Sequence, residues 1–300
     1  MKKKSIVAAI SALSLIVSMN IGIGSVFAGE QNTVPGTAEQ PFVVTDGLFD
    51  QTKTESDLGL SKIEGAETVT VFTATDDTDH YCNGVVMTEF KGKLYTQWQS
   101  SAKDEDAEDT WVAYSVSDDN GATWSEPKVL VPTIDNGYCS SGGWFVSGDT
   151  LVSYINVWYS DTTPRGGFAY YVESTDGEHW SEMKPVLMKD GTPMEGIIEQ
   201  DPHVLASGRI VNAAHFQPGL FAYPIYTDDP SGTKGWVKAQ YTCMEQGEGA
   251  TTSREMEPSL FVNEDGTIVM TFRDQKSSFV RLAAISTDQG ETWSETVSTN

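Results

Sequence analysis

The sequence predicts an all-β protein, a β-propeller of four-stranded blades, on three observations. A Ser-Asp-Gly-Thr-Trp element recurs, with complete copies at 117–124 and 286–293. The tryptophans that close this element and its two degenerate copies, at positions 124, 180, 236 and 293, are 56 or 57 residues apart, which is a structural period. Glycines that each separate two apolar runs keep a similar period and predict hairpin turns: Gly92, Gly148, Gly208 and Gly266. Tandem units of four short strands are typical of propellers.

Residues 1–28 are predicted to be an export signal. Three lysines at positions 2–4 precede an apolar run that continues to Ile23, and the small-residue site Val26-Phe27-Ala28 follows. Polar interruptions in the run favour a cleaved signal over a membrane anchor, and no second apolar run is long enough to span a membrane. We therefore expect a secreted, extracellular protein that is not inserted in a membrane after signal cleavage.

The rest of the chain divides into a short polar segment and one repeat domain. Residues 29–64 are polar and aperiodic and are predicted to be a linker or entry segment, and residues 65–300 are predicted to be the propeller. The formal charge of −24 repels nucleic acid, which excludes it as a partner. An open array of four blades would leave a long exposed strand edge, so we expect a copy truncated at its C-terminus.

The first repeat shows where a site should lie. Strands are expected at 85–90, 94–99 and 111–117, with a fourth after Trp124. In such a meander the start of the first strand and the loop between the second and third strands share one face, whereas the Ser-Asp-Gly-Thr-Trp turn lies on the other. That turn is therefore expected to be structural, with Ser and Asp bonded to backbone amides and Trp packed between blades.

Charged side chains collect on the first of these faces. Glu199 and Glu257 stand nine residues before their hairpin glycines, and His215 and Arg273 stand seven after. A carboxylate near the axis needs a partner. The predicted face gathers Asp106, Arg165, Glu199, Asp201, His203, His215, Glu257 and Arg273. Simpler roles are open: a solvated acidic loop around Asp106, pairing of Arg273 with Asp274, and structural histidines.

Cysteine and tryptophan positions leave further alternatives open. Cys82 and Cys139 hold equivalent places in neighbouring repeats, which fits either a disulfide or two free thiols. Trp98 and Trp158, near the ends of second strands, could stack on sugars or pack inside blades. The histidines are too isolated for a metal set, and the acidic loop 104–109 lacks the order of a calcium loop, so no metal or cofactor is predicted.

Because of the repeated Ser-Asp-Gly-Thr-Trp element, residues 65–300 resemble the sialidase superfamily. The propellers of that superfamily carry this element as the Asp box, S-x-D-x-G-x-T-W. The resemblance implies a six-bladed fold, of which four blades are present. It also implies an exo-glycosidase that removes terminal sialic acid or a similar acidic sugar from glycans. The family uses a tyrosine nucleophile with an assisting glutamate, an aspartate as acid/base, and three arginines that hold the sugar carboxylate.

Carried onto this sequence, the resemblance implies Glu257 as the assisting glutamate and Arg273 as a substrate-binding arginine, sixteen residues later. It implies Asp106, eleven residues before the first box, as the acid/base. The first arginine of the family is missing, because the sequence around Cys82 reads Tyr-Cys-Asn-Gly. The third arginine and the nucleophilic tyrosine belong to later blades. The predicted substrate-binding residues are Arg273, Glu199, Asp201 and Arg165.

Other functions remain open from the sequence. A related Asp-box enzyme could act on another sugar, by hydrolysis or elimination, with Glu199, Asp201 and His203 doing the acid/base work. A non-catalytic propeller could bind glycans without turnover, and a structural or adhesion role is a third alternative. In the first two cases, as in a sialidase, the partner is a glycan or glycoconjugate.

Overall fold

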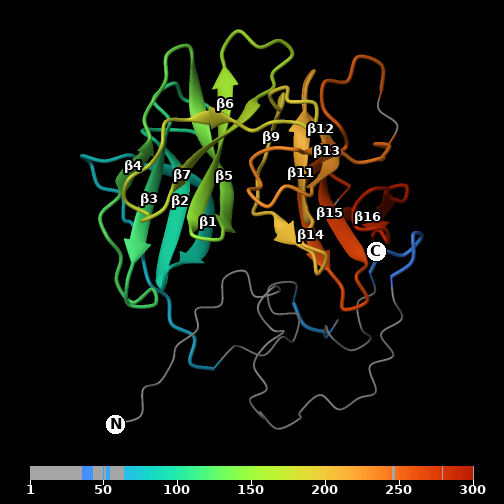
Figure 1. The fold of residues 1–300 in the computed structure, drawn as a ribbon, viewed down its shortest axis with the longest axis horizontal. Helices are drawn as coiled ribbons and strands as arrows, with labels where there is room; N and C mark the ends of the chain where they lie inside the picture. The colour runs from blue at the N-terminus through green and yellow to red at the C-terminus, as the bar shows by residue number, and fades with distance from the viewer. Residues whose placement is uncertain are drawn as a thin grey trace.

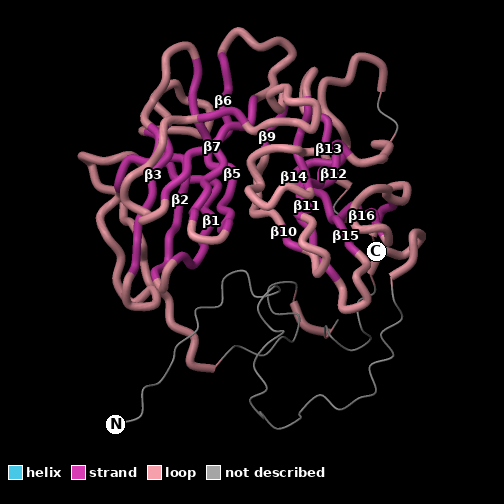
Figure 2. Tube along the Cα trace, viewed as in Figure 1, coloured by secondary structure: helices cyan, strands magenta, loops and turns pink. Residues whose placement is uncertain are grey.

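The structure, a computed structural model, describes residues 36–42, 50, 52–54, 64–244, 247–278 and 280–299. The predicted export signal lies outside them. All regular elements of the described residues are strands (Figure 2). The described residues contain no helix that is long and apolar enough to cross a membrane.

The strands form four sheets in chain order, which we call blades 1 to 4. Blade 1 contains β1 (Tyr81–Phe90), β2 (Lys93–Ser101), β3 (Trp111–Ser117) and β4 (Lys128–Val131). Blade 2 contains β5 (Gly137–Ser147), β6 (Thr150–Tyr159), β7 (Phe168–Ser174) and β8 (Lys184–Pro185). Blade 3 contains β9 (Gly196–Ile197), β10 (His203–Val204), β11 (Ile210–Phe216), β12 (Phe221–Thr227) and β13 (Val237–Lys238). Blade 4 contains β14 (Glu255–Val262), β15 (Ile268–Asp274), β16 (Arg281–Ser286) and β17 (Val297–Ser298).

Each blade is an antiparallel meander, and each packs on the next along the chain (Figure 1). The contacts run from β1 to β5, from β7 to β9 and from β12 to β14. The predicted β-propeller of four-stranded blades is therefore confirmed. Its hairpin glycines lie where the sequence places them; Gly92, for example, has a φ of 77° between β1 and β2.

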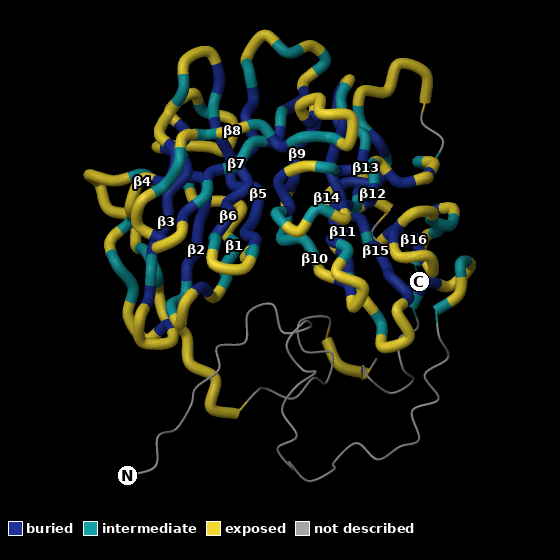
Figure 3. The backbone as a smooth tube through the Cα atoms, viewed as in Figure 1, coloured by how far each residue is buried: buried dark blue, intermediate teal, exposed yellow. Residues whose placement is uncertain are grey.

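Three apolar clusters between neighbouring blades form the core (Figure 3). The Asp-box tryptophan of the later blade belongs to each: Trp180 between blades 1 and 2, Trp236 between blades 2 and 3, and Trp293 between blades 3 and 4. Trp236 is fully buried. Burying a tryptophan removes roughly 150–250 Å² from water, about 4–6 kcal/mol by area. The predicted packing of box tryptophans between blades is confirmed for these three.

The Asp boxes are closed by their own side chains. In the first box Ser117 Oγ accepts a hydrogen bond from the Gly121 amide at 2.8 Å, and Asp119 Oδ1 accepts one from the Thr123 amide at 2.8 Å. Gly121 has a φ of 85°, which favours glycine. The last box repeats both bonds, at 2.9 Å each. The boxes are therefore structural turns, as predicted.

Arg209 links the boxes of blades 3 and 4. Its guanidinium donates to both carboxylate oxygens of Asp228 at 2.7 and 3.1 Å and to Glu291 at 2.7 Å. It also lies 4.4 Å above the ring of Tyr226. Charge-assisted bonds in this fork geometry fix the relative position of the two turns.

The inner strands are irregular near the opposite face. Register shifts occur between Asn83 and Val86 in β1, between Ser141 and Gly143 in β5, and between Met256 and Ser259 in β14. In blade 3 the inner strand is interrupted, and residues 198–202 join β9 to β10. Bulges re-aim side chains and are common beside functional sites. Glu199, Asp201 and Glu257 all lie in these interruptions.

Candidate functional site

Asp106 and Arg165 meet at the face that the sequence predicts. They come from the loops after β2 of blade 1 and after β6 of blade 2, and Arg165 Nη2 donates to Asp106 Oδ1. The hydroxyl of Tyr138, at the start of β5, donates to the same Oδ1 at 2.7 Å and accepts from Arg165 Nη2 at 2.6 Å. These three residues form a cluster that joins two blades.

Aromatic stacking supports this cluster. Tyr138 lies parallel to Trp158, with ring centroids 6.0 Å apart, and the Arg165 guanidinium lies 4.7 Å from the centre of the Trp158 ring. The indole Nε1 of Trp158 donates to Ser140 Oγ at 2.9 Å. Because Trp158 is almost fully buried, it holds the phenol and the guanidinium in fixed places.

Glu257 and Arg273 form a second pair in blade 4. Arg273 Nη1 donates to Glu257 Oε1 at 2.5 Å, and its Nη2 donates to Gln275 Oε1 at 2.7 Å. Glu257 lies in the β14 bulge with a φ of 48°. A left-handed φ is uncommon outside glycine and is concentrated at functional sites. Both charged side chains are about half exposed, so the pair is open to a ligand.

Glu199 is influenced by the charges of both Arg165 and Arg273. Its Oε2 lies 3.0 Å from Nδ1 of His215, which is buried in β11. Burial opposes ionisation of Glu199, but the charges of His215, Arg273 and Arg165 outweigh it and hold the pKa of Glu199 below its ordinary value. Arginines from blades 2 and 4 therefore act on one carboxylate from blade 3.

Asp201 and His203 are placed differently. Asp201 Oδ1 accepts a hydrogen bond from the Trp144 amide of blade 2 at 2.6 Å, and burial raises the pKa of Asp201 to about 6. His203 is partly buried in β10, and burial lowers its pKa. In the described structure neither residue contacts the two arginines. Asp201 instead ties the interrupted strand of blade 3 to blade 2.

Comparison with known proteins identifies the repeats. A family model described as the BNR repeat-like domain matches residues 92–300. The chain belongs to the BNR repeat-like domain family. No curated protein matches it. Among solved structures, a protein of unknown function from Dyadobacter fermentans superposes with a TM-score of 0.61 at 14% identity, over 76% of this chain and 71% of that one.

Two sialidase structures share the fold of this BNR repeat-like domain. The intramolecular trans-sialidase from Ruminococcus gnavus, in complex with oseltamivir carboxylate, gives a TM-score of 0.55 at 15% identity, over 77% of this chain and 73% of that one. Trypanosoma rangeli sialidase in complex with sialic acid gives 0.52 at 19% identity, over 73% of this chain and 37% of that one. At these identities the likeness establishes the sialidase-type propeller fold.

Several alternatives left open by the sequence are decided in this domain. Asp274 pairs with Arg254, at 2.9 and 2.5 Å, rather than with Arg273. Cys82 and Cys139 are free thiols, so the disulfide alternative is wrong for this structure. Trp98 is buried and stacks on Phe72, which favours packing over sugar binding.

Tyr138 belongs to the domain's site although it is not among the residues predicted from the sequence. A signal for it exists in the sequence, because Tyr138 holds the same place in blade 2 as Tyr81 in blade 1. Tyr81 likewise donates to a carboxylate of the acidic loop, Glu105, at 3.1 Å. A tyrosine at a first-strand start, facing that loop, was a usable indication.

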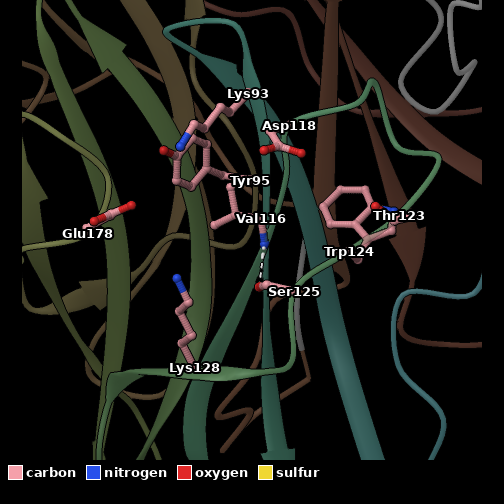
Figure 4. Close-up of a pocket in the computed structure, with 9 residues that line it drawn as sticks. All are labelled: Lys93, Tyr95, Val116, Asp118, Thr123, Trp124, Ser125, Lys128 and Glu178. Atoms are coloured by element: carbon pink, nitrogen blue, oxygen red, sulfur yellow. Dashed lines mark hydrogen bonds between the residues drawn. The ribbon is translucent and has the colours of Figure 1, made fainter.

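No group of three or more His, Cys, Asp or Glu side chains in the described residues is arranged to hold a metal ion. A pocket of about 320 Å³ opens at the Asp-box end of the domain, between blade 1 and Glu178 of blade 2 (Figure 4). Lys93, Tyr95, Lys128 and Glu178 point into it, and none of the predicted site residues lines it. The pocket is thus separate from the candidate site.

Proposed function

We propose that this protein is an exported glycosidase that hydrolyses terminal sialic acid or a similar acidic sugar from glycans. One observation carries the proposal: the half-exposed Arg165 and Arg273 pair with the carboxylates Asp106 and Glu257, and the charges of both arginines help to lower the pKa of Glu199. The fold shared with the Trypanosoma rangeli sialidase, whose structure contains sialic acid, supports it.

The chemistry of these groups fits such a substrate. A guanidinium binds both oxygens of a carboxylate through its planar fork, so the two arginines suit an acidic sugar. Asp106 serves as acid/base at the glycosidic oxygen, and Glu257 is available to accept a proton from an attacking group. Glu199, paired with His215, adds a third carboxylate to this group of charges.

Hydrolysis of a terminal sialoside by the purified protein tests this proposal. Glu257→Ala should lower kcat by about a hundredfold or more, the usual loss for an acid/base group. Arg273→Ala should raise KM. Lys93→Ala is the control, because it removes a positive charge at the Asp-box end of the domain, where Lys93 lines the pocket that is separate from the candidate site. Full activity in Glu257→Ala would refute the assignment.

Other outcomes identify the alternatives. Saturable binding of a sialylated glycan with no release of sugar would indicate a glycan-binding propeller. Release of a neutral sugar or an unsaturated product would indicate an Asp-box enzyme with another substrate.

Export rests on residues 1–28 alone. We expect the protein in the culture medium with an N-terminus at Gly29, which N-terminal sequencing would check.

A further inference from the structure

Asp106 is bound through one oxygen only. Its Oδ1 accepts from both Tyr138 and Arg165, whereas among the described residues its Oδ2 has no hydrogen-bond partner. The side chain is 53% exposed, so Oδ2 is open to the face. The carboxyl group is therefore held by one atom and presents the other.

The contact between Asp106 and Arg165 is easily exchanged. Both side chains are about half exposed, and ion pairs of that kind contribute at most about 1 kcal/mol. The guanidinium keeps its place without Asp106, because it rests on the Trp158 ring. A ligand carboxylate can therefore take the Arg165 donors without moving the arginine.

We propose that Arg165 passes from Asp106 to the carboxylate of the acidic sugar, and that Tyr138 is the positioning residue that then holds Asp106 in place. This inference rests on the proposed function. Arg165 would thereby select acidic over neutral sugars, since a neutral sugar has no group that could replace Asp106 at the guanidinium. Tyr138 would keep the Asp106 carboxyl group oriented toward the substrate.

The chemical step follows from the two oxygens. A proton on Oδ2 passes to the glycosidic oxygen as the bond from that oxygen to the anomeric carbon breaks, and the leaving oxygen takes the electron pair. Water supplies the hydroxyl group of the released sugar, its remaining proton passes to Glu257, and Oδ2 regains a proton from solvent. Throughout, the Tyr138 hydroxyl donates to Oδ1, and this bond strengthens when Asp106 becomes a carboxylate.

Tyr138 is suited to this role by its surroundings. Stacking on Trp158, with an interplanar angle of 11°, fixes the direction of its hydroxyl. Burial, together with the bond to Asp106, raises the pKa of Tyr138 above its ordinary value. The phenol therefore remains a hydrogen-bond donor at any pH at which the protein works.

Two glycosides of sialic acid test the role of Tyr138. Cleavage of a methyl glycoside requires Asp106 to protonate the leaving oxygen, whereas cleavage of a 4-nitrophenyl glycoside depends little on that protonation. Tyr138→Phe keeps the stacked ring and removes the hydroxyl. We expect kcat on the methyl glycoside to fall roughly ten- to a hundredfold, as for loss of a bond to a charged group. We expect less than about a threefold change on the 4-nitrophenyl glycoside, with KM unchanged on both.

Tyr81→Phe is the matched control. It removes the equivalent hydroxyl of blade 1, which bonds Glu105 and not Asp106, and it should leave both rates unchanged. Equal losses on the two glycosides in Tyr138→Phe would show a general structural role and overturn the proposal. No loss on the methyl glycoside would overturn it as well.

Calorimetric titration with free sialic acid tests the exchange at Arg165. Tyr138→Phe should bind it as the wild type does, and Arg165→Ala should bind it at least about tenfold more weakly. Unchanged affinity in Arg165→Ala would overturn the exchange while leaving the proposed function intact. A wild-type protein that neither binds sialic acid nor cleaves either glycoside would refute the proposed function and this inference with it.

Discussion

Replacing Asp201 with asparagine is expected to stabilise the protein at neutral pH. The Asp201 carboxyl group is partly buried where blade 3 meets blade 2, and the Trp144 amide is its one hydrogen-bond donor among the described residues. Burial raises its pKa from an ordinary 3.8 to about 6, so the folded protein holds a proton there more tightly than the unfolded chain does. Asparagine keeps an acceptor for Trp144 and removes the charge.

The magnitude follows from this difference in proton affinity. Between pH 3.8 and about 6 the folded state binds more protons, so stability falls as the pH rises through that window. Above pH 6 the ionised Asp201 lowers the free energy of unfolding by about 3 kcal/mol, and below pH 3.8 this effect vanishes. The side-chain NH₂ of the introduced asparagine would lack an acceptor, which costs about 1 kcal/mol at every pH. The net gain for Asp201→Asn is about 2 kcal/mol at pH 8.

Thermal denaturation of both proteins at pH 4 and pH 8 checks this reasoning. For a domain of this size, 2 kcal/mol corresponds to an increase in Tm of roughly 4–8 °C. At pH 4 the variant should instead melt slightly below the wild type. Other titrating groups are common to the two proteins and cancel in the difference. The same difference in Tm at both pH values would refute the argument.

Three further predictions concern the frame around the site. Arg209→Ala should lower the free energy of unfolding by about 1.5–3 kcal/mol, and a Tm equal to that of the wild type would contradict this. Gly177→Ala should lower Tm far more than Gly148→Ala; both have positive φ, but only at 177 would the new Cβ lie 2.1 Å from a tyrosine hydroxyl. In the native protein Cys82 should react with a thiol reagent and buried Cys139 should not; equal rates would contradict the structure.

The fold could be predicted because its signals are local and repeated. Trp124, Trp180, Trp236 and Trp293 keep one period, and a period of four strands has few solutions other than a propeller. The alternation of turns between two faces then follows from the meander alone. For this reason the sequence alone assigns the candidate residues to one face.

The partners of those residues could not be predicted. From the sequence, either Asp274 or Glu257 could be the ion-pair partner of Arg273. In the structure the partner is Glu257, which lies in the β14 bulge. Asp201, like Asp106, is an aspartate that the sequence assigns to the site. In the structure its carboxylate instead accepts a hydrogen bond from a backbone amide of the neighbouring blade. Sequence spacing gives the strand and the face, but not the rotation of a side chain inside an irregular strand.

By itself, therefore, the sequence determined the order of the four described blades, the structural role of the Asp boxes and the face on which Asp106, Arg165 and Arg273 lie. These properties depend on periodicity, which each repeat carries within itself. The tertiary structure alone decided that Asp106 and Arg165 share a partner, Tyr138, and that His215 supports Glu199. Such contacts join blades or bulged strands, and they exist only once the packing of the blades has fixed the distances between them.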